Sequence, residues 1–172
     1  MIDQTSNNMN LSKALSFQSQ KGEETMEDLN RTDDFVDWLG VKYKTILSSA
    51  DSGGAIAVVD SISPPNSGPP RHIHHKEDEV FVIVTGACRF WLEGIERIAK
   101  AGESVFIPRG KEHTFKVIGE EDCRHFVILT PGGFEGFFAD MAAGQFGIPD
   151  DMPAINESAT RHHMTFTGPP LD

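Results

Sequence analysis

The sequence has few cysteines and little positive charge, and each shortage excludes a class of protein. Only 2 of the 172 residues are cysteine, which excludes a small scaffold held together by many disulfides. Against 26 aspartates and glutamates there are only 15 lysines and arginines, giving a formal net charge of -11. A surface with this balance repels phosphate backbones, so we expect no nucleic-acid partner.

Long apolar runs are also missing. The longest are far shorter than the roughly 20 residues that cross a bilayer as a helix, so we expect no membrane span. Residues 1–20 lack a basic segment followed by an apolar run, so we expect no signal peptide and take a cytoplasmic protein as the default. Cys88 and Cys123 both lie in apolar, strand-like runs and are expected to be buried thiols, although a bridge between them stays open.

The apolar content suffices for one packed domain. Hydrophobic residues make up 38% of the chain, enough to bury a core without disulfides. Residues 1–40 begin with a polar stretch and predict an N-terminal arm, partly flexible or packed on a partner subunit. Residues 41–131 predict the folded domain, and residues 132–172 predict a C-terminal helix followed by an irregular surface tail.

Short apolar runs separated by turn-forming residues fill the predicted domain. Eight of these runs predict strands, at residues 41–47, 55–62, 80–84, 88–92, 95–99, 104–107, 113–118 and 123–130. Many short strands at near-regular spacing predict an all-β fold, an antiparallel barrel or sandwich, rather than alternating strands and helices.

The hydrophobic period changes after residue 133. The apolar side chains there recur at helical spacing, at Phe134, Phe137, Phe138 and Met141. Gly132 and Gly133 precede this stripe and Gly144 ends it. The pattern predicts one short helix packed on the outside or the end of the β domain.

Three histidines and one carboxylate carry the functional signal. His72 and His74 are two residues apart, so in a strand they project from the same face. Glu79 begins the next predicted strand, and His113 begins another. Imidazoles and a carboxylate without thiolate favour a catalytic site for iron, manganese, nickel, cobalt or zinc over a structural zinc site. We therefore predict that His72, His74, Glu79 and His113 hold one divalent transition metal per chain.

Other polar residues compete for places in this site. His75 neighbours the histidine pair but points to the opposite face of its strand. Glu77 and Asp78 are alternative carboxylate ligands, although both fall in the predicted turn, which favours Glu79. The sequence leaves the facing of His125 open, and with it any role in lining a cavity.

The two stretches that hold these ligands resemble the two motifs of the cupin superfamily. The matching positions are His72, His74, Glu79 and Gly86 in the first motif, and Gly102, Pro108, Gly110 and His113 in the second. The run from residue 68 to residue 86 is further similar to small single-domain cupins related to quercetin 2,3-dioxygenase. Asn66 and Val117 stand where the motifs usually have Gly and Asn, and neither is a predicted ligand.

This resemblance implies a fold and an activity. The implied fold is a small antiparallel β-barrel, a double-stranded β-helix or jelly roll, with a short C-terminal helix and commonly a homodimer. The implied activity is that of a metal-dependent dioxygenase, an oxidoreductase acting with O2 on a small apolar or aromatic enol or hydroxyl substrate, with Glu79 as catalytic base. Cupins also include isomerases, lyases and binding or sensor modules without turnover, so these alternatives, and enzyme status itself, stay open.

Overall fold

The structure, a computed structural model, describes residues 35–172. The arm expected at residues 1–40 lies outside these residues, apart from its last part. In that part, Val36–Trp38 form strand β1, which pairs antiparallel with β2 (Val41–Leu47). The folded domain therefore takes in residues that the sequence pattern assigned to the arm.

Two antiparallel sheets make up the domain. The first has six strands in the order β1-β2-β3-β10-β5-β8, where the further strands are β3 (Ala57–Ser63), β10 (Cys123–Thr130), β5 (Asp78–Thr85) and β8 (Ser104–Ile107). The second has five strands in the order β11-β4-β9-β6-β7, namely β11 (Met164–Gly168), β4 (Arg71–His74), β9 (His113–Ile118), β6 (Ala87–Leu92) and β7 (Ile95–Lys100).

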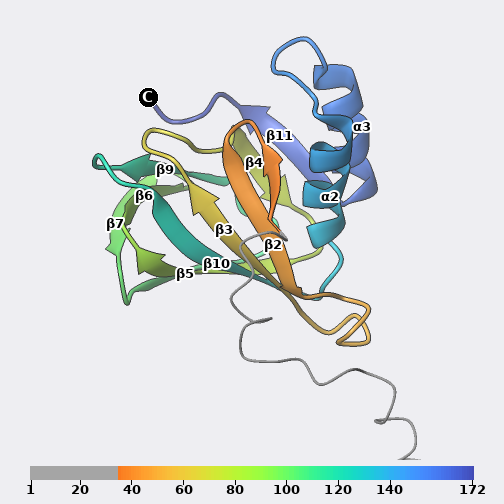
Figure 1. The fold of residues 1–172 in the computed structure, drawn as a ribbon, viewed down its shortest axis with the longest axis horizontal. Coiled ribbons are helices and arrows are strands. Elements are labelled where there is room, and N and C mark those ends of the chain that lie inside the picture. Colours follow the sequence, from red (N-terminus) through yellow and green to blue (C-terminus); the bar gives the residue numbers. More distant parts are fainter. Residues whose placement is uncertain (1–34) are drawn as a thin grey trace, which may run out of the picture. The chain divides into compact units, whose positions relative to one another are not determined.

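The sheets form a sandwich that is consistent with the expected all-β jelly roll (Figure 1). Within residues 35–172, however, no strand pairs with both sheets, so strand pairing does not close them into a continuous barrel. Turns carry the chain from one sheet to the other instead. The shortest of these turns is Gly86, the single residue between β5 and β6.

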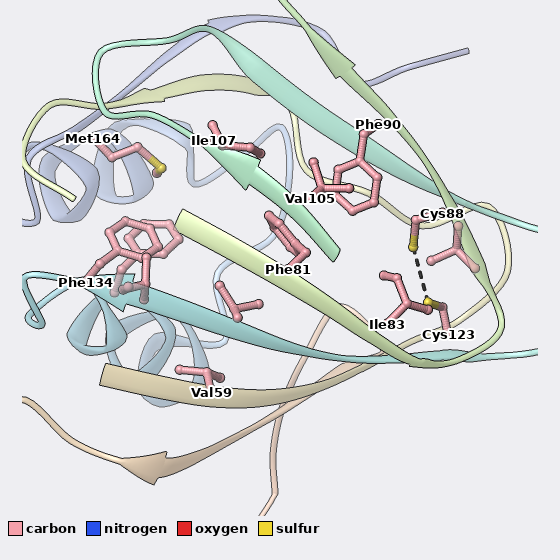
Figure 2. Packing of buried hydrophobic residues seen from close by; sticks show 14 of the residues in the cluster. Val59, Phe81, Ile83, Cys88, Phe90, Val105, Ile107, Cys123, Phe134 and Met164 are labelled. Carbon is pink, nitrogen blue, oxygen red and sulfur yellow. Dashed lines mark hydrogen bonds between the residues drawn. The ribbon is translucent and has the colours of Figure 1, made fainter. Parts of the chain in front are cut away.

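The core lies between the two sheets and follows the period of two that strands impose. On β5, Glu79, Phe81 and Ile83 are buried while the residues between them are less buried. Figure 2 shows Phe81 and Ile83 in the same layer as Phe90 of the opposite sheet. The alternating direction of side chains along a strand thus sets which of them face the interior.

The C-terminal segment is more regular than expected. The predicted apolar stripe forms α2 (Glu135–Gly144), with Phe137 and Met141 buried. The expectation of an irregular tail from residue 147 onward was wrong, because α3 (Met152–Arg161) and β11 follow, and β11 pairs with β4. Neither α2 nor α3, nor any other helix within residues 35–172, is long and apolar enough to cross a membrane.

Candidate metal centre

Three strands and the two facing sheets bring the predicted ligands together. His72 and His74 are the inward-facing residues of β4, and both are buried. His113 begins the neighbouring strand β9 and pairs directly with His72. Glu79 reaches the same point from β5 of the opposite sheet and is also buried. The four residues form one cluster, as their spacing predicts.

The separations in this cluster match a coordination sphere. One donor atom from each residue lies within 4.8 Å of all the others. Glu79 Oε2 is 3.0 Å from His113 Nε2 and 3.9 Å from His74 Nε2. Ligands about 2.1 Å from an ion lie roughly 3 Å apart when adjacent and about 4.2 Å apart when opposite. The donor set therefore fits a divalent transition metal with little rearrangement.

Backbone carbonyls fix the orientation of two of the imidazoles. His72 Nδ1 lies 2.8 Å from the carbonyl oxygen of Pro70, and His113 Nδ1 lies 2.9 Å from that of Lys111. A carbonyl oxygen only accepts hydrogen bonds, so each Nδ1 carries the proton and donates it. The Nε2 atoms are thereby left for a metal, which is how metal-binding histidines are usually held.

The third imidazole has a different support. Among the residues that the structure describes, His74 Nδ1 is buried without a hydrogen-bond partner, and so is the Oε2 atom of Glu77, 4.0 Å away. Buried polar atoms are rarely left unpaired. Glu77, a rival to Glu79 as carboxylate ligand in the sequence, thus lies behind His74 rather than among the four donors. Burial raises the pKa of Glu77.

Burial also sets the protonation of the histidines. It lowers the pKa of His72 to about 3, with a further contribution from His113. Burial, followed by the neighbouring imidazoles, lowers the pKa of His74 well below its usual value. Both rings are therefore neutral near pH 7, the form that binds metals. For His113 burial acts in the same direction, but the hydrogen bond to Glu79 and its charge raise the pKa overall.

A cavity of about 280 Å³ opens onto these ligands. His72, His74 and Glu79 form part of its wall. The remaining wall is largely apolar, and its aromatic side chains include Trp38, Phe81, Phe115, Phe134, Phe137, Phe138 and Phe166. The arrangement gives a polar donor cluster in a largely apolar chamber, which is typical of small-molecule sites.

The two histidines of uncertain role have different positions. His125 is buried and lines the cavity, with its ring 5.5 Å from that of Phe81 and 5.3 Å from that of Phe115. It is not one of the four clustered donors. His75 is exposed, and its Nε2 lies 2.9 Å from the hydroxyl of Thr165 on β11, away from the cluster.

Several cavity residues were missed by sequence reasoning. They come from the segments interpreted as arm and tail, and they include Trp38, Met152, Ile155 and Met164. The signal for Ile155 was present, because Ile155 and Ala159 are one helical turn apart and both are buried. Trp38 is recognisable in the sequence only as a large apolar residue, and this does not show what it packs against.

Comparison with known proteins agrees with the fold and the motif. The cupin domain family matches residues 60–129. No protein of curated function matches the sequence. Similar solved structures include KdgF from Halomonas sp., with 20% identity and a TM-score of 0.56 over 62% of this chain and 95% of that chain.

Two structures from Thermotoga maritima are also similar. A predicted oxalate decarboxylase has 26% identity and a TM-score of 0.50, over 53% of this chain and 80% of its own. A cupin-like protein has 17% identity and a TM-score of 0.52, over 81% of this chain and 84% of its own. These findings agree with the cupin motifs in residues 60–129, while none of them shows a relation to quercetin dioxygenase.

Proposed function

We propose that this cupin is a metal-dependent enzyme, and that its activity is that of a dioxygenase. Its ion would be held by His72, His74, Glu79 and His113, and its substrate would be a small, mainly apolar enol or hydroxyl compound. One observation carries the proposal, namely that three of the four donors, His72, His74 and Glu79, form part of the wall of the 280 Å³ cavity. Structural metal sites are enclosed by their ligands, whereas catalytic sites keep a position open.

The residues divide the chemistry between them. A divalent transition metal bound here would act as a Lewis acid toward a substrate oxygen. Glu79 places a carboxylate in the cavity wall beside the other donors, and a 3.0 Å contact with His113 holds it there. We assign to it the removal of the substrate's hydroxyl or enol proton.

The aromatic wall would select and shield the substrate. Phe81, Phe115 and Phe134 offer apolar faces next to the ligands, and the ring of Phe134 packs 4.2 Å from that of His74. Such a wall favours an aromatic or aliphatic molecule over a sugar phosphate. It also excludes water, which strengthens electrostatic interactions at the cluster.

Oxygen consumption tests the proposal. The protein is loaded in turn with iron, manganese, nickel, cobalt and zinc, and given a panel of flavonols and 1,3-diketones in an oxygen-electrode assay. We expect uptake of O2 with at least one redox-active metal, and loss of that uptake in Glu79→Gln. The absence of O2 uptake with every metal and compound would contradict dioxygenase activity.

The same samples distinguish the alternative functions. Turnover under argon with zinc would identify a non-redox isomerase or lyase, because the nitrogen and oxygen donors also suit that ion. Compounds that bind but are recovered unaltered under all conditions would identify a binding module. Both outcomes would leave the metal centre in place and replace the proposed reaction.

A further inference from the structure

The two cysteines meet away from the metal ligands. Cys88 lies on β6 of the second sheet and Cys123 on β10 of the first, and Figure 2 shows their side chains pointing toward each other. Both are fully buried, and their sulfur atoms are 3.2 Å apart. A further approach of roughly 1 Å would reach the disulfide bond length of about 2.05 Å.

The sheets converge at this point. Gly86 carries the chain from β5 to β6 with a φ of +75° and packs against the backbone of β10. A Cβ on Gly86 would lie 3.0 Å from Cys123 Cα and 2.9 Å from the carbonyl oxygen of Asp122. Facing sheets are ordinarily about 10 Å apart, whereas a disulfide needs Cα atoms about 4.4–6.8 Å apart. The close passage of Gly86, two residues before Cys88, favours that shorter separation.

A histidine completes the cluster. His125 follows Cys123 by two residues on the same face of β10, and one of its ring nitrogens lies within 4.8 Å of both sulfurs. Its Nδ1 is buried and has no hydrogen-bond partner in the described part of the chain. The same side chain lines the cavity, so the cavity reaches the residue next to the sulfur pair.

The two thiols are not equivalent. The Cys88 thiol donates a hydrogen bond to the sulfur of Cys123. That hydrogen bond, assisted by His125, lowers the pKa of Cys123 to about 5, while the same contact and burial raise the pKa of Cys88. We therefore assign Cys123 as the thiolate that attacks first and Cys88 as the thiol that reacts second.

We propose that Cys88 and Cys123 are a redox-active dithiol that hydrogen peroxide oxidises to a disulfide joining the two sheets. The Cys123 thiolate attacks one peroxide oxygen, breaking the O–O bond and releasing hydroxide, and becomes a sulfenic acid. Cys88 then attacks the Cys123 sulfur, its proton leaves with the sulfenic oxygen as water, and the S–S bond forms. Two electrons pass from the sulfur pair to the peroxide.

The geometry favours a disulfide over a metal at this cluster. Thiolates bound to one tetrahedral zinc ion at about 2.3 Å would lie roughly 3.8 Å apart. The sulfurs at 3.2 Å would have to separate inside a close-packed core, whereas a disulfide draws them together. Oxidation also removes the thiolate beside His125, so the redox state of the pair alters the surroundings of a cavity-lining residue.

Thiol counting by mass spectrometry tests the proposal. The reduced, full-length protein is treated with hydrogen peroxide under native conditions, then denatured with iodoacetamide and weighed intact. We expect a single chain lighter by two hydrogen atoms that takes up no alkyl group, and full recovery of two alkylations after dithiothreitol. Two alkyl groups on the treated protein, or disulfides formed only between chains, would overturn the proposal.

Two single variants test the order of attack. In Cys88→Ser, Cys123 should stop at a sulfenic acid that dimedone traps, whereas Cys123→Ser should take up no dimedone. Equal labelling of the two variants would contradict the assigned roles. If serine prevents folding, Cys88→Ala and Cys123→Ala provide the same comparison.

A variant that lacks two of the proposed metal ligands shows whether disulfide formation depends on the metal centre. His72→Ala/His74→Ala should form the disulfide at the same rate as the unaltered protein, because the sulfur pair needs no metal. A rate that falls with the double variant would show that the metal centre drives the oxidation, and would overturn the inference. Thiols that become reactive only after a chelator removes zinc would overturn it as well.

Discussion

The group next to Nδ1 of each imidazole decides how firmly the centre would hold an ion. For His74 this group is a carboxyl group instead of a backbone carbonyl. His72 and His113 are oriented by backbone carbonyls, but His74 Nδ1 has no hydrogen-bond partner within residues 35–172 and lies 4.0 Å from the buried carboxyl group of Glu77. A metal on Nε2 makes the Nδ1 proton a stronger donor, so we expect the 4.0 Å gap to close on binding. Glu77 would then orient His74 without contacting the ion.

Glu77→Gln tests this support. The change keeps the shape of the side chain but removes the carboxylate, so we expect metal affinity to fall about 10–100-fold while the fold is retained. Competition with a chromogenic chelator measures the affinity. His75→Gln is the matched control, since His75 is exposed and faces β11, and its affinity should be unchanged. Equal affinities for Glu77→Gln and the unaltered protein would contradict this role.

At the scale of elements, polar contacts hold α2 to α3. Asp140 of α2 accepts hydrogen bonds from the hydroxyl of Ser158 at 2.6 Å, from Arg161 at 2.9 Å and from His162 at 3.0 Å. The bond from Ser158 leads these contacts in lowering the pKa of Asp140 to about 2. A carboxyl group with a depressed pKa stabilises the folded state above its unfolded pKa, and this stabilisation is lost as the pH falls.

Asp140→Asn should therefore show a pH-dependent effect. The variant lacks the stabilisation at every pH, so its Tm should be lower than that of the unaltered protein at pH 7. The difference should shrink as the pH falls from about 4 to about 2. Thermal unfolding followed by circular dichroism measures it. Glu157→Gln removes only an exposed pair with Arg161 and should change little. A difference in Tm that is the same at both ends of this range would contradict the account.

The elements also show what the sequence could and could not predict. Where a short apolar run lies between turn residues, as in β5 and β10, a strand was predictable. The period of two then placed Glu79 on the same face as Phe81 and Ile83, and with it the meeting of Glu79 with the histidines. β11 was missed because it is an edge strand of only five residues in a Pro-rich segment, too short for its alternation to stand out. Its partner β4 is far away in the sequence, so no local signal marks the pairing.

The whole molecule sets the size and character of the cavity, which local patterns did not reveal. Trp38 comes from the first described strand and Phe166 from the last, so the wall is complete only when both ends of the domain are in place. The donor cluster needed only two motifs, whereas the wall needed the full topology. The size of the cavity is therefore set by the whole fold, and the donor cluster by the two motifs.

Oligomeric state is a further prediction at this scale. The resemblance to small cupins implies a homodimer, so light scattering coupled to size exclusion should give twice the mass of one chain. The measurement is made at moderate salt, because the net charge of -11 repels like chains at low ionic strength. A mass equal to one chain at all accessible concentrations would contradict this prediction.

Elemental analysis of the protein purified without chelator tests the central claim most directly. The account predicts about one equivalent of a divalent transition metal per chain, and almost none in His72→Ala/His74→Ala, since metal binding requires several of the donors together. The variant should keep the circular dichroism spectrum of the unaltered protein, because the core between the sheets does not depend on the ion. Equal metal content in both proteins, or wholesale unfolding of the variant, would contradict a catalytic metal centre at these four residues.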